Sequence, residues 1–159
     1  MQNALAVIDR LIREHDAIRQ NAASLVNAIS DEEAVKKLAE TDTANLAGLL
    51  EALRATARGL ESHFNLEETG LMAALDWSGD RRLSSAFSIL FVQHEALRGA
   101  FAASISDLVN LLREKPSGKV ERSRAKVITA HLSTAIGTLR AHAASEDILL
   151  WELKASLLK

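Results

Sequence analysis

Four of the five histidines in this 159-residue chain form two pairs with the same spacing. The pairs are His15 with His63 and His94 with His142, and the members of each pair are 48 residues apart. Glu67 follows His63 by four residues, and Glu146 follows His142 by four. Because four residues make about one turn of an α-helix, each such His/Glu pair directs a nitrogen and an oxygen toward one point. Two ligand atoms that converge in this way are typical of a metal site.

The two halves of the chain match each other at an offset of 79 residues. The offset superimposes His15 on His94, His63 on His142 and Glu67 on Glu146, and it also superimposes Leu11 on Leu90, Leu53 on Leu132, Leu60 on Leu139 and Leu71 on Leu150. A chance agreement of two histidines and one glutamate at a single offset is rare, so we interpret the pattern as an internal repeat. The repeat predicts a single domain over 1–159, built from a duplicated helical hairpin with halves 1–79 and 80–159.

The ligand types restrict which metal such a site would take. Four imidazoles and two carboxylates at one level of a helical core would be costly to bury unless they bound a cation. The chain has no cysteine, so only nitrogen and oxygen ligands are available, and these suit iron, manganese or zinc. Two histidines and two bridging carboxylates would leave an octahedral iron room for solvent, O2, peroxide or nitric oxide.

The elements that must position these residues are helices. Pro and Gly number only one and seven, aromatic residues make up 4%, and strong helix formers dominate the composition. Helical periodicity runs from about residue 4 to 29, and Ser30 with Glu33 resembles a capping box for a short helix ending near Ala39. Three longer helices are expected over about 43–75, 81–114 and 119–157, separated by turn signals at 76–80 and 115–118. The prediction is an all-α, up-down-up-down four-helix bundle.

Charge and hydropathy exclude several classes of protein. The net charge is −2, so no basic face for nucleic acid is expected. No run of 18 apolar residues occurs, which argues against a membrane span. Charges at Asp9 and Arg10 interrupt the first apolar stretch before a signal peptide could form. These features predict a soluble, cytoplasmic protein.

The spaced histidines and glutamates resemble one known family. His15, the segment His63-Phe-Asn-Leu-Glu67, His94 and the segment His142-Ala-Ala-Ser-Glu146 are similar to the motifs of the hemerythrin-like, or HHE cation-binding, domain. The resemblance covers essentially the whole chain, and it implies a four-helix bundle that holds a non-haem di-iron centre. It further implies that His15 and His63 bind one iron, that His94 and His142 bind the other, and that Glu67 and Glu146 bridge them.

The chain departs from the oxygen-carrying hemerythrins at two positions. Those proteins have a second histidine four residues after the first on the third helix, where this chain has Arg98. Their last motif ends on an aspartate five residues after its histidine, so Asp147 is an alternative to Glu146 as the second bridge. The loss of a fifth histidine favours sensing, detoxification or iron homeostasis over reversible O2 carriage. A metal store or donor without turnover is the alternative, and the sequence does not decide whether the protein is an enzyme.

Several residues outside the six predicted metal ligands also have expected positions or roles. His131 has no partner in the repeat and is expected at the surface or core edge, away from the metal. Ser145 offers a hydroxyl to a bound ligand, and Gly59, one turn before His63, leaves space for a small molecule. Trp77 and Trp151 are expected to pack at the ends of the bundle.

Charged neighbours of the motif have two possible roles. Arg19 and Arg98 match across the repeat and lie four residues after the first histidine of each half. They are expected either to pair with carboxylates that orient the metal-binding histidines or to point into solvent. Glu68 is expected to have one of the same two roles.

Overall fold

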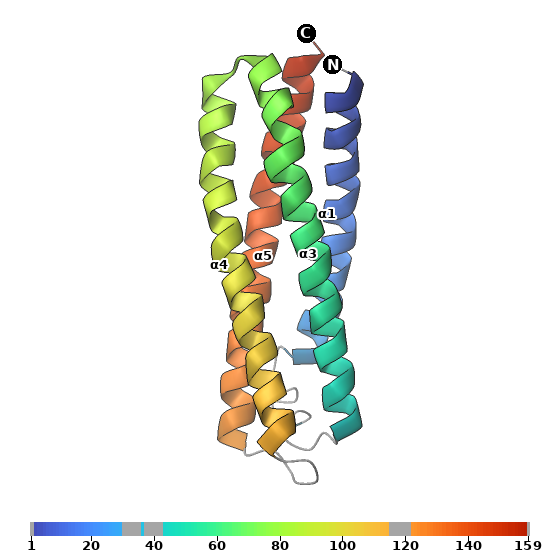
Figure 1. The fold of residues 1–159 in the computed structure, drawn as a ribbon, viewed down its shortest axis with the longest axis vertical. Helices are drawn as coiled ribbons and strands as arrows, with labels where there is room; N and C mark the ends of the chain where they lie inside the picture. The colour runs from blue at the N-terminus through green and yellow to red at the C-terminus, as the bar shows by residue number, and fades with distance from the viewer. Residues whose placement is uncertain (1, 30–35, 37–42, 115–121, 159) are drawn as a thin grey trace.

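Four long α-helices make up this chain in a computed structural model that describes residues 2–29, 36, 43–114 and 122–158. They are α1 (Gln2–Ile29), α3 (Thr43–Ser78), α4 (Arg81–Glu114) and α5 (Arg122–Leu157). These ranges contain no β-strand. Successive helices alternate in direction, so both chain ends lie at the same end of the bundle as the α3–α4 turn (Figure 1). The predicted all-α four-helix bundle is confirmed.

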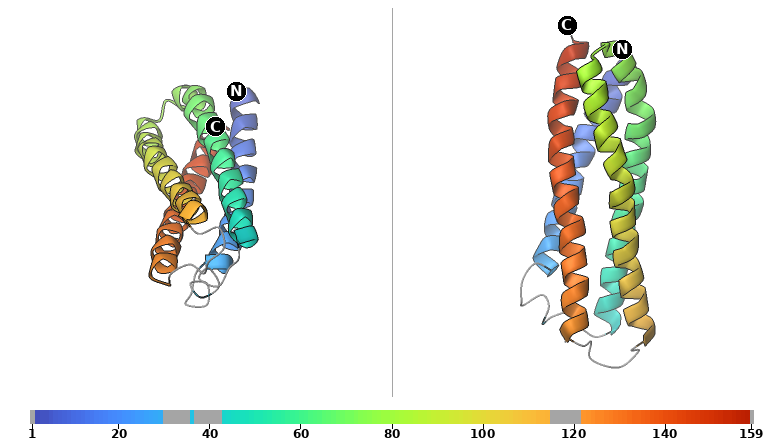
Figure 2. Two further views of the ribbon diagram at one scale, coloured as in Figure 1. Left: turned by 60° about the horizontal axis from the view of Figure 1, so that its bottom comes forward. Right: turned by 90° about the vertical axis from the view of Figure 1, so that its left-hand side faces the viewer.

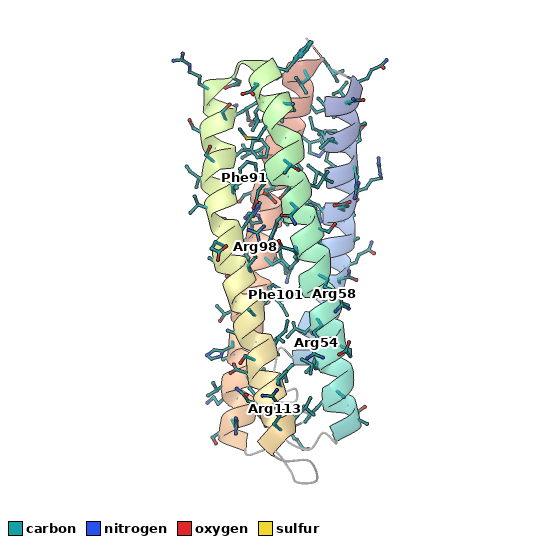
Figure 3. The ribbon with its side chains drawn as sticks, viewed as in Figure 1. Arg54, Arg58, Phe91, Arg98, Phe101 and Arg113 are labelled. Carbon is teal, nitrogen blue, oxygen red and sulfur yellow. The ribbon has the colours of Figure 1, made fainter. Side chains whose placement is uncertain are left out.

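Each helix packs along two neighbours. The adjacent pairs are α1 with α3, α3 with α4, α4 with α5 and α5 with α1, which closes the bundle into a ring, and α3 also contacts α5. Two further views show the helices following one common long axis (Figure 2). Side chains from all four helices fill the space between them (Figure 3). Any residue on an inward face therefore meets residues of the other helices at the same level.

The turn between α3 and α4 follows directly from its sequence. Gly79 has a φ of 63°, a left-handed conformation that a residue with a Cβ rarely adopts, and its amide donates to the Leu75 carbonyl at 3.2 Å. Asp80 then caps α4, because its Oδ1 accepts hydrogen bonds from the amides of Arg82 and Leu83 at 2.9 and 3.2 Å. This tight connection fixes the vertical register of α3 against α4.

The apolar core is divided into two layers by buried polar residues. One layer, near the α3–α4 turn, includes Leu11, Leu71 and Phe87. The other, toward the opposite end, includes Leu53 and Leu108. The sequence positions place the buried histidines and glutamates between these two layers. The apolar residues of each helix therefore hold its polar residues at a common height.

Some expectations from the sequence fall outside the described ranges or are wrong. The capping box at Ser30 and Glu33, the short helix near Ala39, and residues 119–121 of the last helix lie outside the described residues. The tryptophans do not pack into the bundle: Trp77 is 67% exposed and Trp151 is 55% exposed. Both lie on outward helix faces. The prediction failed because apolar character alone does not determine which face a residue near a helix end occupies. No helix in the described part of the chain is long and apolar enough to cross a membrane.

Candidate metal centre

Each of the four helices contributes one buried histidine to the middle of the bundle. The helices and their residues are α1 with His15, α3 with His63 and Glu67, α4 with His94, and α5 with His142 and Glu146. None of the six is more than 3% exposed. The four-residue spacing places each glutamate one turn from its histidine on the same inward face, as the sequence predicts. The structure thus brings together all six predicted site residues.

The histidines meet in pairs through their Nε2 atoms. Nε2 of His15 lies 3.0 Å from Nε2 of His63, and the corresponding distance between His94 and His142 is 3.1 Å. Two nitrogen ligands that each lie about 2.1 Å from one ion at a right angle are about 3.0 Å apart. The observed separations therefore fit two histidines that bind one ion side by side.

The two glutamates lie between the histidine pairs and face both of them. Glu67 Oε1 is 3.3 Å from Nε2 of His63, while its Oε2 is 3.3 Å from Nε2 of His94. Glu146 Oε2 is 3.1 Å from Nε2 of His142 and 3.4 Å from Nε2 of His15. The described residues therefore contain two groups able to hold a metal ion, one around each histidine pair, and both groups include the two glutamates. This is the arrangement that two carboxylate-bridged ions require.

Three carboxylate oxygens in the cluster have no hydrogen bond of normal geometry to any residue that the structure describes. They are both oxygens of Glu67 and Oε2 of Glu146, all buried. Their contacts of 3.1–3.5 Å to imidazole nitrogens are ion-pair distances only. Burying an unpaired carboxylate oxygen is costly, whereas a metal ion at this position would satisfy all three. The donor set therefore fits a metal on an observation independent of its sequence motif.

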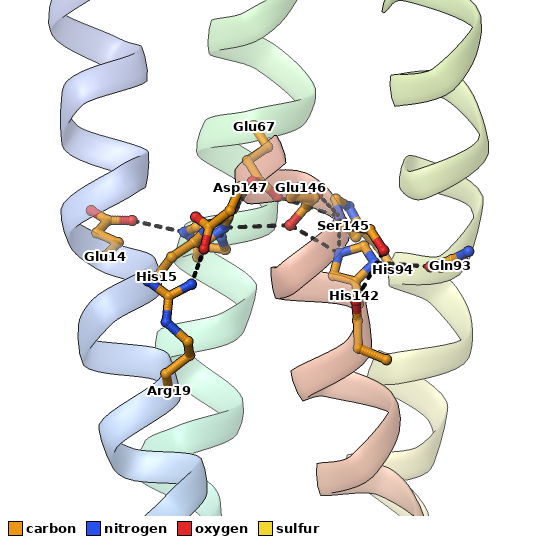
Figure 4. Close-up of polar contacts among 12 residues, drawn as sticks. Glu14, His15, Arg19, Glu67, Gln93, His94, His142, Ser145, Glu146 and Asp147 are labelled. Carbon is orange, nitrogen blue, oxygen red and sulfur yellow. Dashed lines mark hydrogen bonds and ion pairs between the residues drawn. The ribbon is translucent and has the colours of Figure 1, made fainter. Parts of the chain in front are cut away.

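A second ring of residues surrounds the histidines and binds their Nδ1 atoms. The Nδ1 contacts are His15 to Asp147 at 2.7 Å, His63 to Glu14 at 2.9 Å, His94 to Glu68 at 2.7 Å and His142 to Gln93 at 3.0 Å. Figure 4 shows three of these acceptors, from α1, α4 and α5, around the central cluster. An oxygen acceptor at Nδ1 keeps the proton on that nitrogen and leaves the Nε2 lone pair facing inward. All four histidines are thereby set in the form that binds a metal.

Two arginines hold part of this outer ring in place. Arg19 donates to Asp147, and Arg98 donates to Glu68 through both terminal nitrogens at 3.2 Å. These arginines and Glu68 therefore have the first of the two expected roles: Glu68 binds a metal-site histidine, and the arginines pair with the carboxylates that do so. Arg98 also lies 5.3 Å from the centre of the Phe64 ring, which stacks on His94 at 4.0 Å.

Without a metal ion, the cluster holds protons tightly. Burial disfavours the charged form of His15, but hydrogen bonds to Glu146 and Glu67 outweigh it and raise its pKa to about 9. The same balance raises the pKa of His94 to about 9 and also raises that of His63. Burial alone would raise the pKa of Glu67, but hydrogen bonds from the histidines outweigh burial and lower this pKa to about 2. The histidines also hold the pKa of Glu146 well below its usual range. The site thus keeps its carboxylates ionised, and its histidines hold protons that a bound metal ion must displace.

Neighbours of the motif fall outside the central cluster. Asp147, the alternative to Glu146, points toward α1 and binds the outer nitrogen of His15. Ser145 is exposed and donates its hydroxyl to the Ala141 carbonyl, so the expectation that it serves a bound ligand is wrong. His131 is exposed, as expected, and pairs with an aspartate on α4.

Sequence reasoning missed two members of the outer ring, Glu14 and Gln93. Each immediately precedes the first histidine of its half, and the two are 79 residues apart, the offset of the repeat. Glu68 and Asp147 are related by the same offset. The repeat therefore contained the signal for the whole outer ring, although the ring is recognisable only once the helices are docked.

Two cavities lie about one helical turn from the cluster. One, of about 390 Å³ between α1 and α3, is lined by Ile18, Gly59 and Leu60 among others. The second, of about 140 Å³ between α3 and α4, is lined by Leu60, Phe64 and Arg98 among others. The expected space beside Gly59 is therefore present, and a Cβ added there would meet nothing within 4 Å.

The chain matches the model of a known protein family over most of its length. The model of the Hemerythrin HHE cation binding domain matches residues 6–153. No curated protein and no solved structure matches the chain. The family match spans all six residues of the central cluster.

Proposed function

Because the chain belongs to the hemerythrin HHE cation-binding domain family, we propose that its central cluster holds two iron ions bridged by Glu67 and Glu146. His15 and His63 bind one ion, and His94 and His142 bind the other. The centre binds a small ligand, namely O2, nitric oxide or peroxide, in sensing, detoxification or iron homeostasis. Zinc and manganese are chemically possible occupants of the same ligand set.

One observation carries this proposal: four imidazoles present their Nε2 atoms to two buried carboxylates, and the described residues offer these carboxylates no other partner. Each histidine is locked by a hydrogen bond at its other nitrogen. An arrangement that only filled the core would not need four oriented lone pairs, because apolar side chains of similar size are cheaper to bury. A bound metal ion would offset the free-energy cost of burying these imidazoles and carboxylates in the core.

The number of protein ligands supports binding of a further small molecule. Each ion would receive two histidine nitrogens and one oxygen from each glutamate, which makes four ligands. Iron commonly takes six, so each position leaves room for an external ligand. Phe64 stacked on His94 and the apolar layers above and below limit access by bulk water.

Access for a small molecule is favoured on the side of the cluster where the two cavities lie. Ile18 and Gly59, which line the larger cavity, lie within one turn of His15 and His63. Leu60 lines both cavities. A diatomic molecule or peroxide would have only about one helical turn to travel from either cavity to the centre.

The proposal is tested by metal content and spectroscopy. Protein produced with iron and purified in air is expected to contain two irons per chain and to show oxo-bridge absorption in the visible range that changes on addition of azide or nitric oxide. A colourless protein with bound zinc would support a metal store or donor instead. Failure to bind any metal after iron reconstitution would refute both functions.

Two matched substitutions separate the bridging carboxylate from its neighbour. Glu146→Gln removes a proposed bridge and is expected to abolish binding of at least one iron. Asp147→Asn only weakens the acceptor for His15 and is expected to lower affinity by roughly tenfold, the effect typical of residues that orient metal ligands. Loss of iron in Asp147→Asn with retention in Glu146→Gln would reverse the assignment.

A further inference from the structure

The two histidine pairs have unequal surroundings at one point. Across the repeat, Glu68 corresponds to Asp147, and both are carboxylates that accept from a histidine Nδ1. Glu14, however, corresponds to Gln93, so a carboxylate on one side is replaced by a neutral amide on the other. The His15/His63 pair therefore has two carboxylate acceptors, whereas the His94/His142 pair has one.

We propose that this difference makes the two metal positions inequivalent, so that the position formed by His15 and His63 takes up the first metal ion. The inference rests on the proposed function, because it concerns the order in which the same centre fills. It assigns to Glu14 and Gln93 the role of positioning residues that set the relative affinity of the two positions. Neither residue contacts the metal itself.

The physical reason lies in the acceptor at the outer nitrogen. Glu14 Oε2 lies 2.9 Å from Nδ1 of His63, and Gln93 Oε1 lies 3.0 Å from Nδ1 of His142, so the two contacts are nearly equal in length. They differ in charge. A carboxylate acceptor polarises the imidazole more than an amide does, so Nε2 becomes a stronger ligand, and the negative charge also attracts the cation.

A nearby arginine opposes this difference without removing it. Arg10 donates to the other oxygen of Glu14 at 2.7 Å, and the position equivalent to Arg10 in the second half is Ile89. The Arg10 side chain is 56% exposed, whereas Glu14 is 30% exposed. The arginine charge is therefore more strongly screened by water than the carboxylate that contacts His63 directly.

The remaining charges that contact the outer ring are similar around the two pairs, because Arg19 also pairs with Asp16 at 2.6 Å and Arg98 also pairs with Glu61 at 2.8 Å. Arg19 neutralises Asp147, and Arg98 neutralises Glu68 at equivalent positions. Glu67 and Glu146 both face the two histidine pairs, so they favour neither position. The two metal positions therefore differ in one Nδ1 acceptor, which is the carboxylate of Glu14 on one side and the amide of Gln93 on the other.

The test measures which position fills first. Chelator-treated protein receives one equivalent of Zn²⁺ and is crystallised, and anomalous scattering at the zinc edge gives the occupancy of each position. In the unmodified chain we expect the His15/His63 position to exceed the other by about tenfold, the usual effect of an orienting residue. The double exchange Glu14→Gln with Gln93→Glu is expected to reverse the preference.

Single variants and a matched control keep the test decisive. Glu14→Gln alone and Gln93→Glu alone each give both positions the same number of carboxylate acceptors, so their occupancies are expected to become nearly equal. Glu51→Gln is the control, because it removes an exposed carboxylate that also pairs with an arginine on its own helix, at 2.7 Å, but contacts no histidine. It is expected to leave the preference unchanged.

The possible failures are distinguishable. Equal occupancy in the unmodified chain, or the same preferred position in the unmodified and exchanged chains, would overturn this inference while leaving the metal centre intact. If the exchanged chain does not fold, an unchanged preference in either single variant would overturn it equally. Absence of zinc from both positions, with no iron bound on reconstitution, would instead refute the proposed function.

Discussion

Metal binding at this centre is expected to displace about two protons, one from each histidine pair. In both pairs the Nδ1 proton is committed to an outer oxygen, and the Nε2 atoms face each other at 3.0 and 3.1 Å. Two bare lone pairs at that distance repel, so a proton or a metal ion must lie between them. The pKa values of His15 and His94, both raised to about 9, give the strength with which those protons are held.

The size of the effect follows from these pKa values. At pH 8 a group with a pKa of about 9 is about 90% protonated, so His15 and His94 together carry about 1.8 protons. Four imidazoles with the ordinary pKa of about 6.5 would carry about 0.1 proton in total at the same pH. Glu67, with its pKa lowered to about 2, is already ionised and releases none. The two cases therefore differ by more than tenfold.

Calorimetry can count these protons. Titrating Zn²⁺ into chelator-treated protein at pH 8, in buffers of different ionisation enthalpy, gives the number of protons released from the slope of heat against buffer enthalpy. Water bound to zinc also loses a proton near neutral pH, so the histidines must be observed directly as well. NMR titration of the metal-free protein is expected to give midpoints near 9 for His15 and His94.

The refuting result is equally concrete. Midpoints for both histidines at or below about 6.5 would show that the carboxylates do not hold protons in the cluster. Release of less than about one proton would lead to the same conclusion. His131→Ala is the control, because that histidine is exposed, pairs with Asp107 and lies about three helical turns before His142 on α5. It is expected to leave the proton count at the centre unchanged.

Three further predictions concern metal content and stability. His94→Ala is expected to remove at least one metal, whereas His131→Ala keeps both; equal metal loss in the two variants would contradict the site. Gly59→Ala is expected to raise the free energy of unfolding by about 0.5–1 kcal/mol in urea denaturation, because Ala favours helix and its Cβ meets no neighbour within 4 Å. Gly70→Ala places its Cβ 3.0 Å from a valine methyl and is expected to gain less, so an equal gain would contradict the packing. In the metal-free protein, the raised histidine pKa values stabilise the fold below about pH 6.5 and this stabilisation is lost as pH rises through about 9. The lowered pKa of Glu67 stabilises the fold above about pH 4.5, and this stabilisation is lost as pH falls toward about 2. The melting temperature is therefore expected to peak between about pH 4.5 and 6.5. A peak above pH 8 would contradict this.

The central cluster was predictable because it depends on spacing along single helices. Four residues between His63 and Glu67 determine a shared face without knowledge of the other helices. The bundle was predictable for a related reason, since long amphipathic helices with short connections have few ways to bury their apolar faces. The family resemblance drawn from these motifs is likewise confirmed.

The outer ring was harder to predict because it depends on how the helices are rotated against one another. Glu146 and Asp147 are adjacent in sequence, but neighbouring residues on a helix point about 100° apart. Glu146 therefore faces the centre while Asp147 reaches α1. Nothing local to Glu14 or Gln93 distinguishes them from solvated residues, and only the docking of α1 on α3 and of α4 on α5 gives them their histidine contacts.

The pattern of outer contacts explains why both halves of the chain are needed for one centre. Glu14 and Gln93 each serve a histidine of their own half, but Asp147 crosses to His15 and Glu68 crosses to the first histidine of the second half. A single hairpin would therefore leave half of its histidines unoriented, whereas two identical hairpins related by a two-fold axis would complete each other. Such a pair would have identical acceptors at both positions. Joining the halves in one chain removes that constraint, because the two halves need not be identical. Glu14 and Gln93 differ at equivalent positions, and by our proposal this difference alters the ligand strength of one histidine pair.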